Sequence, residues 1–278
     1  MAPRGDLSDS QFVTAAGVRV HYKEVGEGYP VICLHGAGPG ANSESNFRRN
    51  VGALSERFRA VLVDMPQFGK SEKVPIEEGR LGFNARVMDA FMTETGIERA
   101  HYIGNSMGGQ VALKLAVDKP ERVDRLVVLG PGAINNPIFV PSPLEGIKLI
   151  ADYYKGEGPT REKLRKLLDT LVYDSSFLTD EVVEERFQTT IEPDNLELFA
   201  KRQGRYKKED LYADLGRIES PTLIVWGMDD RFGALDVGLQ MTRLMKRAQM
   251  HIFARCGHWA QVEHAEAFNR MVVGFLSD

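Results

Sequence analysis

The sequence predicts an α/β protein with a mostly parallel central sheet, helices on both faces of that sheet, and an all-helical insertion. Short apolar runs, such as residues 31–34 and 60–63, are typical of strands buried on both faces, and helical segments separate them. From about residue 135 to residue 212, charged segments with helical spacing replace the strand-like runs. We therefore expect a core made of residues 1–134 and 213–278, with residues 135–212 as a helical lid.

Each element has its own signal. Residues 12–22 alternate apolar and polar around Ala16-Gly17, which predicts a β-hairpin. A segment rich in Ala, Met and Phe predicts a helix at about 83–95. The other strands are expected at residues 31–34, 60–63, 99–103, 126–129, 221–227 and 249–253. The helices of the insertion are expected near residues 143–155, 160–172, 179–191 and 194–206.

The composition is that of an ordinary globular protein. The chain has 278 residues, 43% of them hydrophobic and 27% charged, with a net charge of −4. Asp and Glu outnumber Lys and Arg by 39 to 35 and the basic residues are dispersed, so we expect no nucleic-acid partner. Two cysteines, Cys33 and Cys256, cannot form a disulfide framework, which fits the reducing cytoplasm where we expect the protein. No apolar run of membrane-spanning length and no signal-peptide core are present, so we expect no membrane partner.

A serine lies on a predicted sharp turn between a strand and a helix. The string Gly104-Asn105-Ser106-Met107-Gly108 follows the strand at 99–103 and precedes a segment with strong helix formers. Such a turn lifts the serine hydroxyl above the sheet and crowds its neighbours, which explains the glycines. Ser106 is therefore a candidate nucleophile, although a glycine-rich turn with an ordinary serine would have the same sequence.

Two glycine-rich loops resemble phosphate-binding loops without matching them. The loop at 35–40 has Asn42-Ser43 where a nucleotide-binding loop needs Lys followed by Ser or Thr. Gly69-Lys70-Ser71 lacks the upstream glycine, because position 64 is Asp. Neither loop is expected to bind a nucleotide.

An acidic loop and a histidine follow the last two predicted strands. Asp229 and Asp230 come after the strand at 221–227, and His258 comes after the strand at 249–253. Because parallel strands end at the same edge of a sheet, we expect these side chains to lie near Ser106.

The order serine, acid, histidine along the chain is that of a hydrolytic triad. In that interpretation Ser106 is the nucleophile or hydrogen-bonding acid, His258 the base, and Asp230 the group that orients the imidazole. The backbone N–H groups of Ala37 and Met107 would form an oxyanion hole. Taken singly, each residue could be an ordinary loop or surface residue, and the ordered set is what predicts a hydrolase.

An arginine interrupts the apolar side of the helix predicted at 179–191. At 100° per residue, Arg186 falls between Val182 and Val183, opposite the glutamates of the same helix. A guanidinium there must either extend to solvent or pair with an anion. If the helix covers the triad, Arg186 is a candidate carboxylate clamp.

With these residues in place, the sequence resembles the meta-cleavage product hydrolases, which cleave carbon–carbon bonds in bacterial aromatic-ring degradation. The resemblance covers nearly the whole chain. It rests on selective strings: Leu34-His35-Gly36-Ala37-Gly38-Pro39-Gly40-Ala41, Asn46-Phe47, Gly104-Asn105-Ser106-Met107-Gly108-Gly109, Leu171-Val172-Tyr173-Asp174, Trp226-Gly227-Met228-Asp229-Asp230-Arg231-Phe232 and Cys256-Gly257-His258-Trp259-Ala260-Gln261. The resemblance implies an α/β-hydrolase fold, and its spacing selects Asp230 over Asp229 as the triad acid.

The resemblance also implies a reaction. The substrate would be a 2-hydroxy-6-oxohexa-2,4-dienoate, cut by water between C5 and C6 to 2-hydroxypenta-2,4-dienoate and a carboxylic acid. No metal or organic cofactor is expected, and the family commonly forms homodimers or larger homo-oligomers. The residues that would hold the dienoate end are Gly38, Asn46, Asn105, Ser176, Arg186 and Trp259. Leu171 and Phe232 would line the pocket for the C6 substituent.

The nature of the C6 substituent is less constrained. Glu44-Ser45-Asn46 stands where many relatives with aryl substrates carry Trp before Ser-Asn, and Leu171 stands where an aromatic residue is common. The insertion as a whole is nevertheless more similar to the branch with aryl or bulky substrates. A small-alkyl dienoate hydrolase, a carboxylesterase with the same triad, and a non-catalytic binding protein with this fold are the alternatives.

Overall fold

A computed structural model of the chain describes residues 7–132, 137–140, 142–201 and 209–278. Eight strands form one sheet in the order β1-β2-β4-β3-β5-β6-β7-β8, in which every pair is parallel except β1 with β2 and β2 with β4. The strands span β1 (Gln11–Ala15), β2 (Val18–Val25), β3 (Pro30–Leu34), β4 (Arg59–Val63), β5 (Ala100–Asn105), β6 (Val123–Leu129), β7 (Thr222–Gly227) and β8 (Ala248–Phe253). The predicted sheet is confirmed.

The predicted hairpin is confirmed as well. Ala16 and Gly17 connect β1 to β2, and both have positive φ angles, 48° and 82°. Two successive residues with positive φ give the turn a twist that matches the two antiparallel strands.

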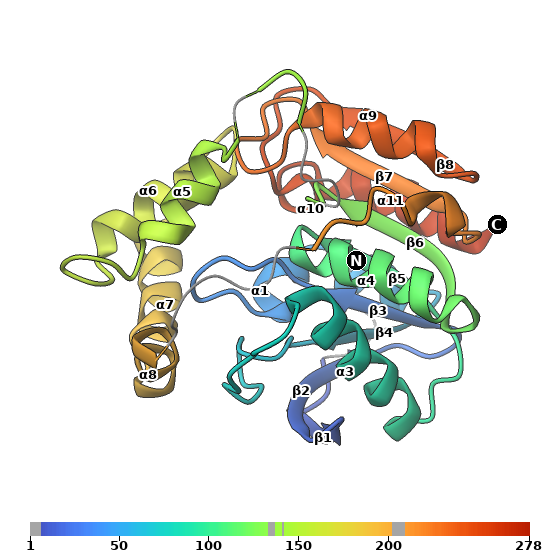
Figure 1. Ribbon diagram of the computed structural model, residues 1–278, viewed down its shortest axis with the longest axis horizontal. Helices are drawn as coiled ribbons and strands as arrows, with labels where there is room; N and C mark the ends of the chain where they lie inside the picture. The colour runs from blue at the N-terminus through green and yellow to red at the C-terminus, as the bar shows by residue number, and fades with distance from the viewer. Residues whose placement is uncertain (1–6, 133–136, 141, 202–208) are drawn as a thin grey trace.

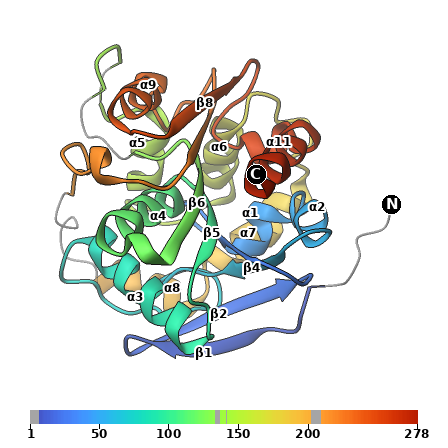
Figure 2. The ribbon, with the colours of Figure 1, turned by 90° about the vertical axis from the view of Figure 1, so that its right-hand side faces the viewer.

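Helices cover both faces of the sheet, and each layer encloses its own core (Figures 1 and 2). On one face lie α3 (Arg80–Glu94), α4 (Met107–Asp118) and α9 (Leu235–Leu244), whose apolar side chains pack on alternate residues of the strands. On the other lie α2 (Val51–Ser55) and α11 (Ala265–Ser277). Burial on both faces is why the parallel strands have continuous apolar sequences.

Two short helices belong to the loops at the carboxyl edge of the sheet. They are α1 (Ser43–Phe47) after β3 and α10 (Ala260–Glu263) after β8. The sequence did not predict them, because four or five residues are too few to show a helical period. Within the described residues, no helix is long and apolar enough to cross a membrane.

Four helices of the insertion lie to one side of the sheet, at the left of Figure 1. They are α5 (Glu145–Asp152), α6 (Arg161–Leu171), α7 (Asp180–Thr190) and α8 (Pro193–Lys201). Each overlaps a helix predicted from the sequence, and the last residues of the prediction at 194–206 lie outside the described residues. The side chains of Thr160 and Thr179 cap α6 and α7 by accepting hydrogen bonds from backbone N–H groups.

A third apolar core joins these helices to the rest of the protein. It combines leucines of α6 and Phe187 of α7 with Phe232, Trp259 and Val262 from the loops after β7 and β8. The insertion therefore packs on the same loops that carry the candidate acid and base. The boundaries predicted for it, 135 and 212, stay a prediction.

Candidate active site

Ser106 occupies a strained turn between β5 and α4. Its φ and ψ angles are 52° and −114°, a conformation that residues other than glycine rarely adopt. The turn needs glycine on both sides, since a Cβ atom on Gly104 would lie 2.5 Å from the backbone of Gly108, and one on Gly108 would lie 2.1 Å from Leu34 O. The Ser106 N–H donates to Leu129 O at 2.7 Å, which fixes the turn against β6.

Asp230 and His258 form a buried pair. The imidazole Nδ1 lies 2.7 Å from Asp230 Oδ2, and both side chains are almost fully buried. The other carboxylate oxygen, Oδ1, accepts hydrogen bonds from the backbone N–H groups of Phe232 (2.7 Å) and Gly233 (2.9 Å). Asp229 instead accepts from the backbone N–H of Cys256 at 3.3 Å. Asp230 is thus the acid that faces the histidine.

Gly130 connects the serine turn to this pair. It follows Leu129, whose carbonyl accepts from Ser106 N–H, and it has a φ of 52°. A Cβ atom on Gly130 would lie 2.9 Å from His258 Cε1 and 3.0 Å from Asp230 Oδ2. The carboxyl ends of β5, β6, β7 and β8 therefore bring Ser106, Asp230 and His258 to one edge of the sheet.

The loop that carries Ala37 lies against the serine. A Cβ atom on Gly36 would be 3.3 Å from Ser106 Cβ. His35 holds this loop, since its Nδ1 lies 2.8 Å from Gly36 O and its Nε2 accepts from Met65 N–H at 3.0 Å. These two partners require a neutral imidazole with the proton on Nδ1. Burial lowers the pKa of His35, in agreement with a neutral ring.

Three buried amides form a chain beside the candidate triad. Asn46 Nδ2 donates to Asn105 Oδ1 at 3.5 Å, and Asn105 Nδ2 donates to His258 O at 3.4 Å. Gln261 Nε2 donates to Asn46 Oδ1 at 3.1 Å. Asn46 and Asn105 were predicted to bind substrate, and the structure brings them together. No role was predicted for Gln261, although it closes the string Cys256-Gly257-His258-Trp259-Ala260-Gln261.

Arg186 is buried and points inward, as its place on the helix predicted. The side chain is 8% exposed, its Nε donates to Pro39 O at 2.8 Å, and its guanidinium carbon lies 5.3 Å from the Trp259 ring centroid. A Cβ atom on Gly38 would lie 2.8 Å from Arg186 Nη2. Among the described residues no carboxylate lies within ion-pair distance of Arg186. Burial lowers the pKa of this guanidinium to about 10, so it is still a cation at neutral pH.

The two residues predicted to line the pocket for the C6 substituent both contact the histidine. Phe232 stacks on the His258 ring with a centroid distance of 5.1 Å and an interplanar angle of 24°. Leu171, the last residue of α6, accepts a hydrogen bond from His258 N–H at 2.7 Å through its carbonyl oxygen. The end of α6 is thereby fixed directly to the histidine.

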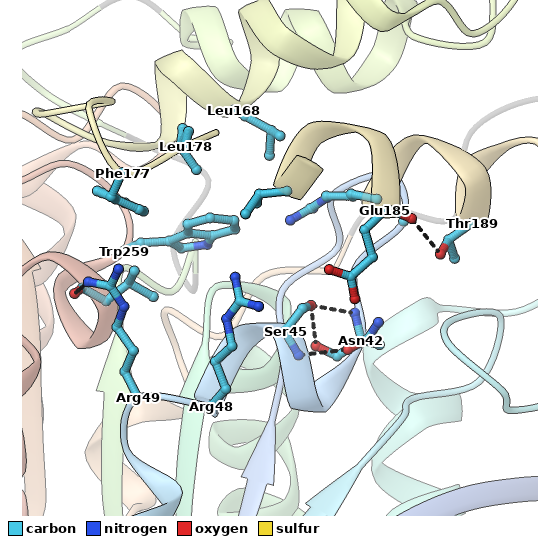
Figure 3. A pocket seen from close by; sticks show the side chains of 14 residues that line it. Asn42, Ser45, Arg48, Arg49, Leu168, Phe177, Leu178, Glu185, Thr189 and Trp259 are labelled. Carbon is cyan, nitrogen blue, oxygen red and sulfur yellow. Dashed lines mark hydrogen bonds between the residues drawn. The ribbon is translucent and has the colours of Figure 1, made fainter. Parts of the chain in front are cut away.

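Ser176 does not join this group. It is exposed in the turn between α6 and α7, where its backbone N–H donates to Asp174 Oδ1 at 2.9 Å. The neighbouring Phe177 and Leu178, and not Ser176, line the pocket beside Trp259 (Figure 3). The turn after residue 174 directs the serine outward, which helical or strand spacing could not have predicted.

Glu263 is a residue that sequence reasoning missed. Its Oε1 accepts hydrogen bonds from the backbone N–H groups of Tyr173 (2.7 Å) and Asp174 (3.2 Å), and its Oε2 accepts from Gly257 N–H (2.7 Å). One carboxylate therefore joins the end of α6 to the residue that precedes His258. No sequence signal marks such a role, because all three donors are backbone groups.

Comparison with known proteins agrees with this architecture. The family described as the alpha/beta hydrolase fold matches residues 29–265, which is most of the chain. A solved structure of a meta-cleavage product hydrolase from Pseudomonas fluorescens IP01 superposes with a TM-score of 0.87 at 33% sequence identity, covering 98% of each chain.

Curated relatives identify a narrower family within this fold. A 2-hydroxy-6-oxononadienedioate/2-hydroxy-6-oxononatrienedioate hydrolase from Burkholderia vietnamiensis is 45% identical over 93% of this chain and 91% of its own length. A 2-hydroxy-6-oxo-6-phenylhexa-2,4-dienoate hydrolase from Burkholderia cepacia is 40% identical over the full length of both. The chain belongs to the α/β-hydrolase fold family and, within it, to the meta-cleavage product hydrolases.

Proposed function

We propose that the protein hydrolyses the C5–C6 bond of a 2-hydroxy-6-oxohexa-2,4-dienoate, giving 2-hydroxypenta-2,4-dienoate and a carboxylic acid. The observation that carries the proposal is Arg186, a buried cation next to Trp259 with no carboxylate partner among the described residues. A buried unpaired charge is costly, and a substrate carboxylate would compensate it. An esterase acting on neutral esters has no use for such a group.

The reaction has two stages. The proton of the 2-hydroxyl group leaves and a proton is added at C5, which converts the dienol to its keto tautomer. His258, oriented by Asp230, is the group proposed to carry this proton. Asn46, Asn105, Gly38 and Trp259 are proposed to hold the dienoate end while the tautomer forms.

In the second stage an oxygen nucleophile adds to the C6 carbonyl. The oxyanion that forms would accept hydrogen bonds from the Ala37 and Met107 N–H groups, and each such donor typically stabilises a transition state by about 2.7–4 kcal/mol. The proton of the nucleophile passes to His258 as the oxyanion forms. Collapse then breaks the C5–C6 bond, its electron pair leaves with the dienolate fragment, and His258 returns the proton to that fragment. The nucleophile is either Ser106, which gives an acyl-enzyme for water to hydrolyse, or water itself, which gives a gem-diol.

The C6 substituent is proposed to be aryl or another bulky uncharged group. Phe232 and Leu171 flank His258 and belong to an apolar core, and burying a phenyl ring there would contribute a few kcal/mol more than a methyl group. A substituent that ends in a carboxylate, as in the dienedioates of some relatives' names, would need a second cation. The side chain of Arg231, next to Phe232, is half exposed and paired with Glu145.

A panel of dienoates tests the function. Substrates with phenyl, methyl and carboxyethyl groups at C6 lose their visible absorbance on cleavage, so kcat/KM can be ranked directly. We expect the phenyl compound to rank first. A higher kcat/KM for methyl or carboxyethyl would refute the aryl assignment, and no cleavage of any dienoate together with rapid ester hydrolysis would favour the carboxylesterase.

Ser106→Ala separates the two nucleophiles. If Ser106 forms an acyl-enzyme, the variant should lose at least about 1000-fold in kcat while it still converts bound dienol to the keto form. Retention of more than about a tenth of the wild-type kcat would exclude Ser106 as the nucleophile.

We further propose that the protein is a cytoplasmic homo-oligomer. Light scattering coupled to size-exclusion chromatography tests the oligomeric state.

A further inference from the structure

A pocket opens between α1 and the insertion, beside Arg186 and Trp259, and residues of the third apolar core form part of its lining. In Figure 3, Leu168, Phe177 and Leu178 line it from above and Asn42 and Ser45 from below, with Trp259 between them. Trp259 follows His258 directly in the chain. The pocket is therefore adjacent to the end of the active site where Arg186 lies.

Three guanidinium groups line this pocket against a single carboxylate. Arg48 and Arg49 follow α1 and are exposed, and their side chains extend toward Trp259 (Figure 3). Arg186 is the third cation and Glu185 the only acid among the lining residues. Arg49 donates to Val262 O at 3.0 Å and lies 4.8 Å from the Phe177 ring centroid.

The cations are not neutralised by the protein. Within the part of the chain that the structure describes, no carboxylate lies within ion-pair distance of Arg48, Arg49 or Arg186. The two other arginines of the insertion within the described residues are paired, Arg161 with Glu184 at 2.6 Å and Arg165 with Asp169 at 3.2 Å. The pocket thus carries a local excess of positive charge on a protein whose net charge is −4.

We propose that this pocket is an outer binding site for the carboxylate of the incoming substrate, from which the anion passes to Arg186. The inference rests on the proposed function and adds Arg48 and Arg49 as residues that capture the substrate. The ligand class is a small organic carboxylate with a conjugated or apolar chain, since Phe177 and Trp259 offer aromatic faces next to the guanidinium groups. Clustered charges at the mouth of a site raise the local concentration of an oppositely charged ligand.

Ionic strength provides the first test. The screening length is about 30 Å in 0.01 M salt and about 8 Å in 0.15 M salt, so an attraction at the mouth of the site weakens as salt is added. For the phenyl-substituted dienoate, kcat/KM should fall with salt in the wild type. Arg48→Gln should lower the low-salt value about two- to fivefold, mainly through KM, and flatten the salt dependence.

Matched variants make the result specific. Arg48→Lys should keep most of the wild-type kcat/KM at low salt, because it keeps the charge. Arg48→Glu should lower kcat/KM further than Arg48→Gln does. Arg270→Gln removes an exposed arginine on α11 and should behave as the wild type does. If Arg48→Gln and Arg270→Gln show the same salt dependence as the wild type, the outer site does not exist.

An ester pair keeps this test independent of carbon–carbon cleavage. The two substrates are mono-p-nitrophenyl succinate, which carries a free carboxylate, and neutral p-nitrophenyl acetate. The kcat/KM for the anionic ester divided by that for the neutral ester should fall in Arg48→Gln and be close to the wild-type value in Arg48→Lys. This holds even if the protein cleaves no dienoate. An unchanged ratio would overturn the outer site while leaving the proposed function untouched.

Discussion

Gly130 determines how closely the serine turn approaches the histidine–aspartate pair. Its α-carbon faces His258 and Asp230 so closely that a Cβ atom would lie 2.9 Å from His258 Cε1 and 3.0 Å from Asp230 Oδ2, closer than ordinary van der Waals contact. The Asp230 carboxylate cannot move easily, because it accepts hydrogen bonds from the backbone N–H groups of Phe232 and Gly233. A side chain at position 130 must therefore displace the imidazole or the carboxylate.

The first prediction follows at this residue scale. Gly130→Ala should lower kcat at least tenfold, because a displacement of about 1 Å at a catalytic group can cost as much as 100-fold. Gly96→Ala is the matched control: Gly96 has a φ of 69°, and a Cβ atom there meets nothing within 4 Å. Both variants should lose about 1 kcal/mol of stability from the positive φ, measured by urea unfolding. Equal kcat values in the two variants would contradict this account.

Arg186 supports a second prediction at the same scale. Arg186→Gln removes a charge-assisted bond to the substrate carboxylate, worth about 1.5–3 kcal/mol, and should raise KM for the dienoate at least tenfold. Neutral p-nitrophenyl acetate should be hydrolysed about as well as by the wild type.

The control for that experiment is Arg165→Gln, which removes a partly exposed arginine on α6 of the same insertion. It should leave both substrates unaffected. If Arg186→Gln impairs the ester and the dienoate equally, Arg186 supports the lid structure and does not bind the substrate.

At the scale of elements, the lid and the histidine loop are connected by one carboxylate and one carbonyl group. Glu263 accepts from Tyr173, Asp174 and Gly257, and Leu171 O accepts from His258 N–H. All of these bonds except that of Gly257 join residues about 90 positions apart, and together they enclose His258 between α6 and α10. The position of His258, the proposed base, therefore depends on the docking of α6.

Glu263→Gln should accordingly lower kcat about tenfold, because an amide has only one accepting oxygen for three backbone donors. Glu266→Gln, in the first turn of α11 and almost fully exposed, is the control. A lower melting temperature with an unchanged kcat would mean that Glu263 contributes only to stability.

For the whole molecule, the pH dependence of stability has an identifiable source. His101 of β5 is buried beside Tyr29 and Phe58, and burial lowers its pKa from 6.5 to about 4. Between these pH values the unfolded chain binds a proton that the folded protein does not. The contribution of His101 to the free energy of unfolding therefore falls as the pH drops from about 6.5 to 4 and stays constant below that, and above 6.5 the ring is neutral in both states.

His101→Gln should flatten this part of the stability curve. One proton changes the free energy of unfolding by at most about 1.4 kcal/mol per pH unit, which urea unfolding at several pH values can resolve. His35 is buried with a lowered pKa too, so the relevant quantity is the difference between variant and wild type. His251→Gln, on the exposed side of β8, should keep the wild-type slope. A variant curve parallel to the wild type would assign the slope to other groups.

The sequence by itself determined the strands, the serine turn and the inward face of the lid helix. Strands buried on both faces require continuous apolar residues, and the turn at Ser106 requires glycines at 104 and 108, so both requirements appear directly in the order of residues. The helical period placed Arg186 on the buried face of α7, where the structure has it. These features depend on neighbours within a few positions.

The tertiary structure alone decided the groups that hold the site together. The burial of Gln261 on Asn46, the three hydrogen bonds of Glu263, the arginines beside Trp259 and the outward position of Ser176 all depend on segments far apart in the chain. Most of these contacts join a side chain to a backbone N–H or C=O group, which every residue type offers. Such contacts leave no period and no characteristic residue at the partner position, and only the folded arrangement shows them.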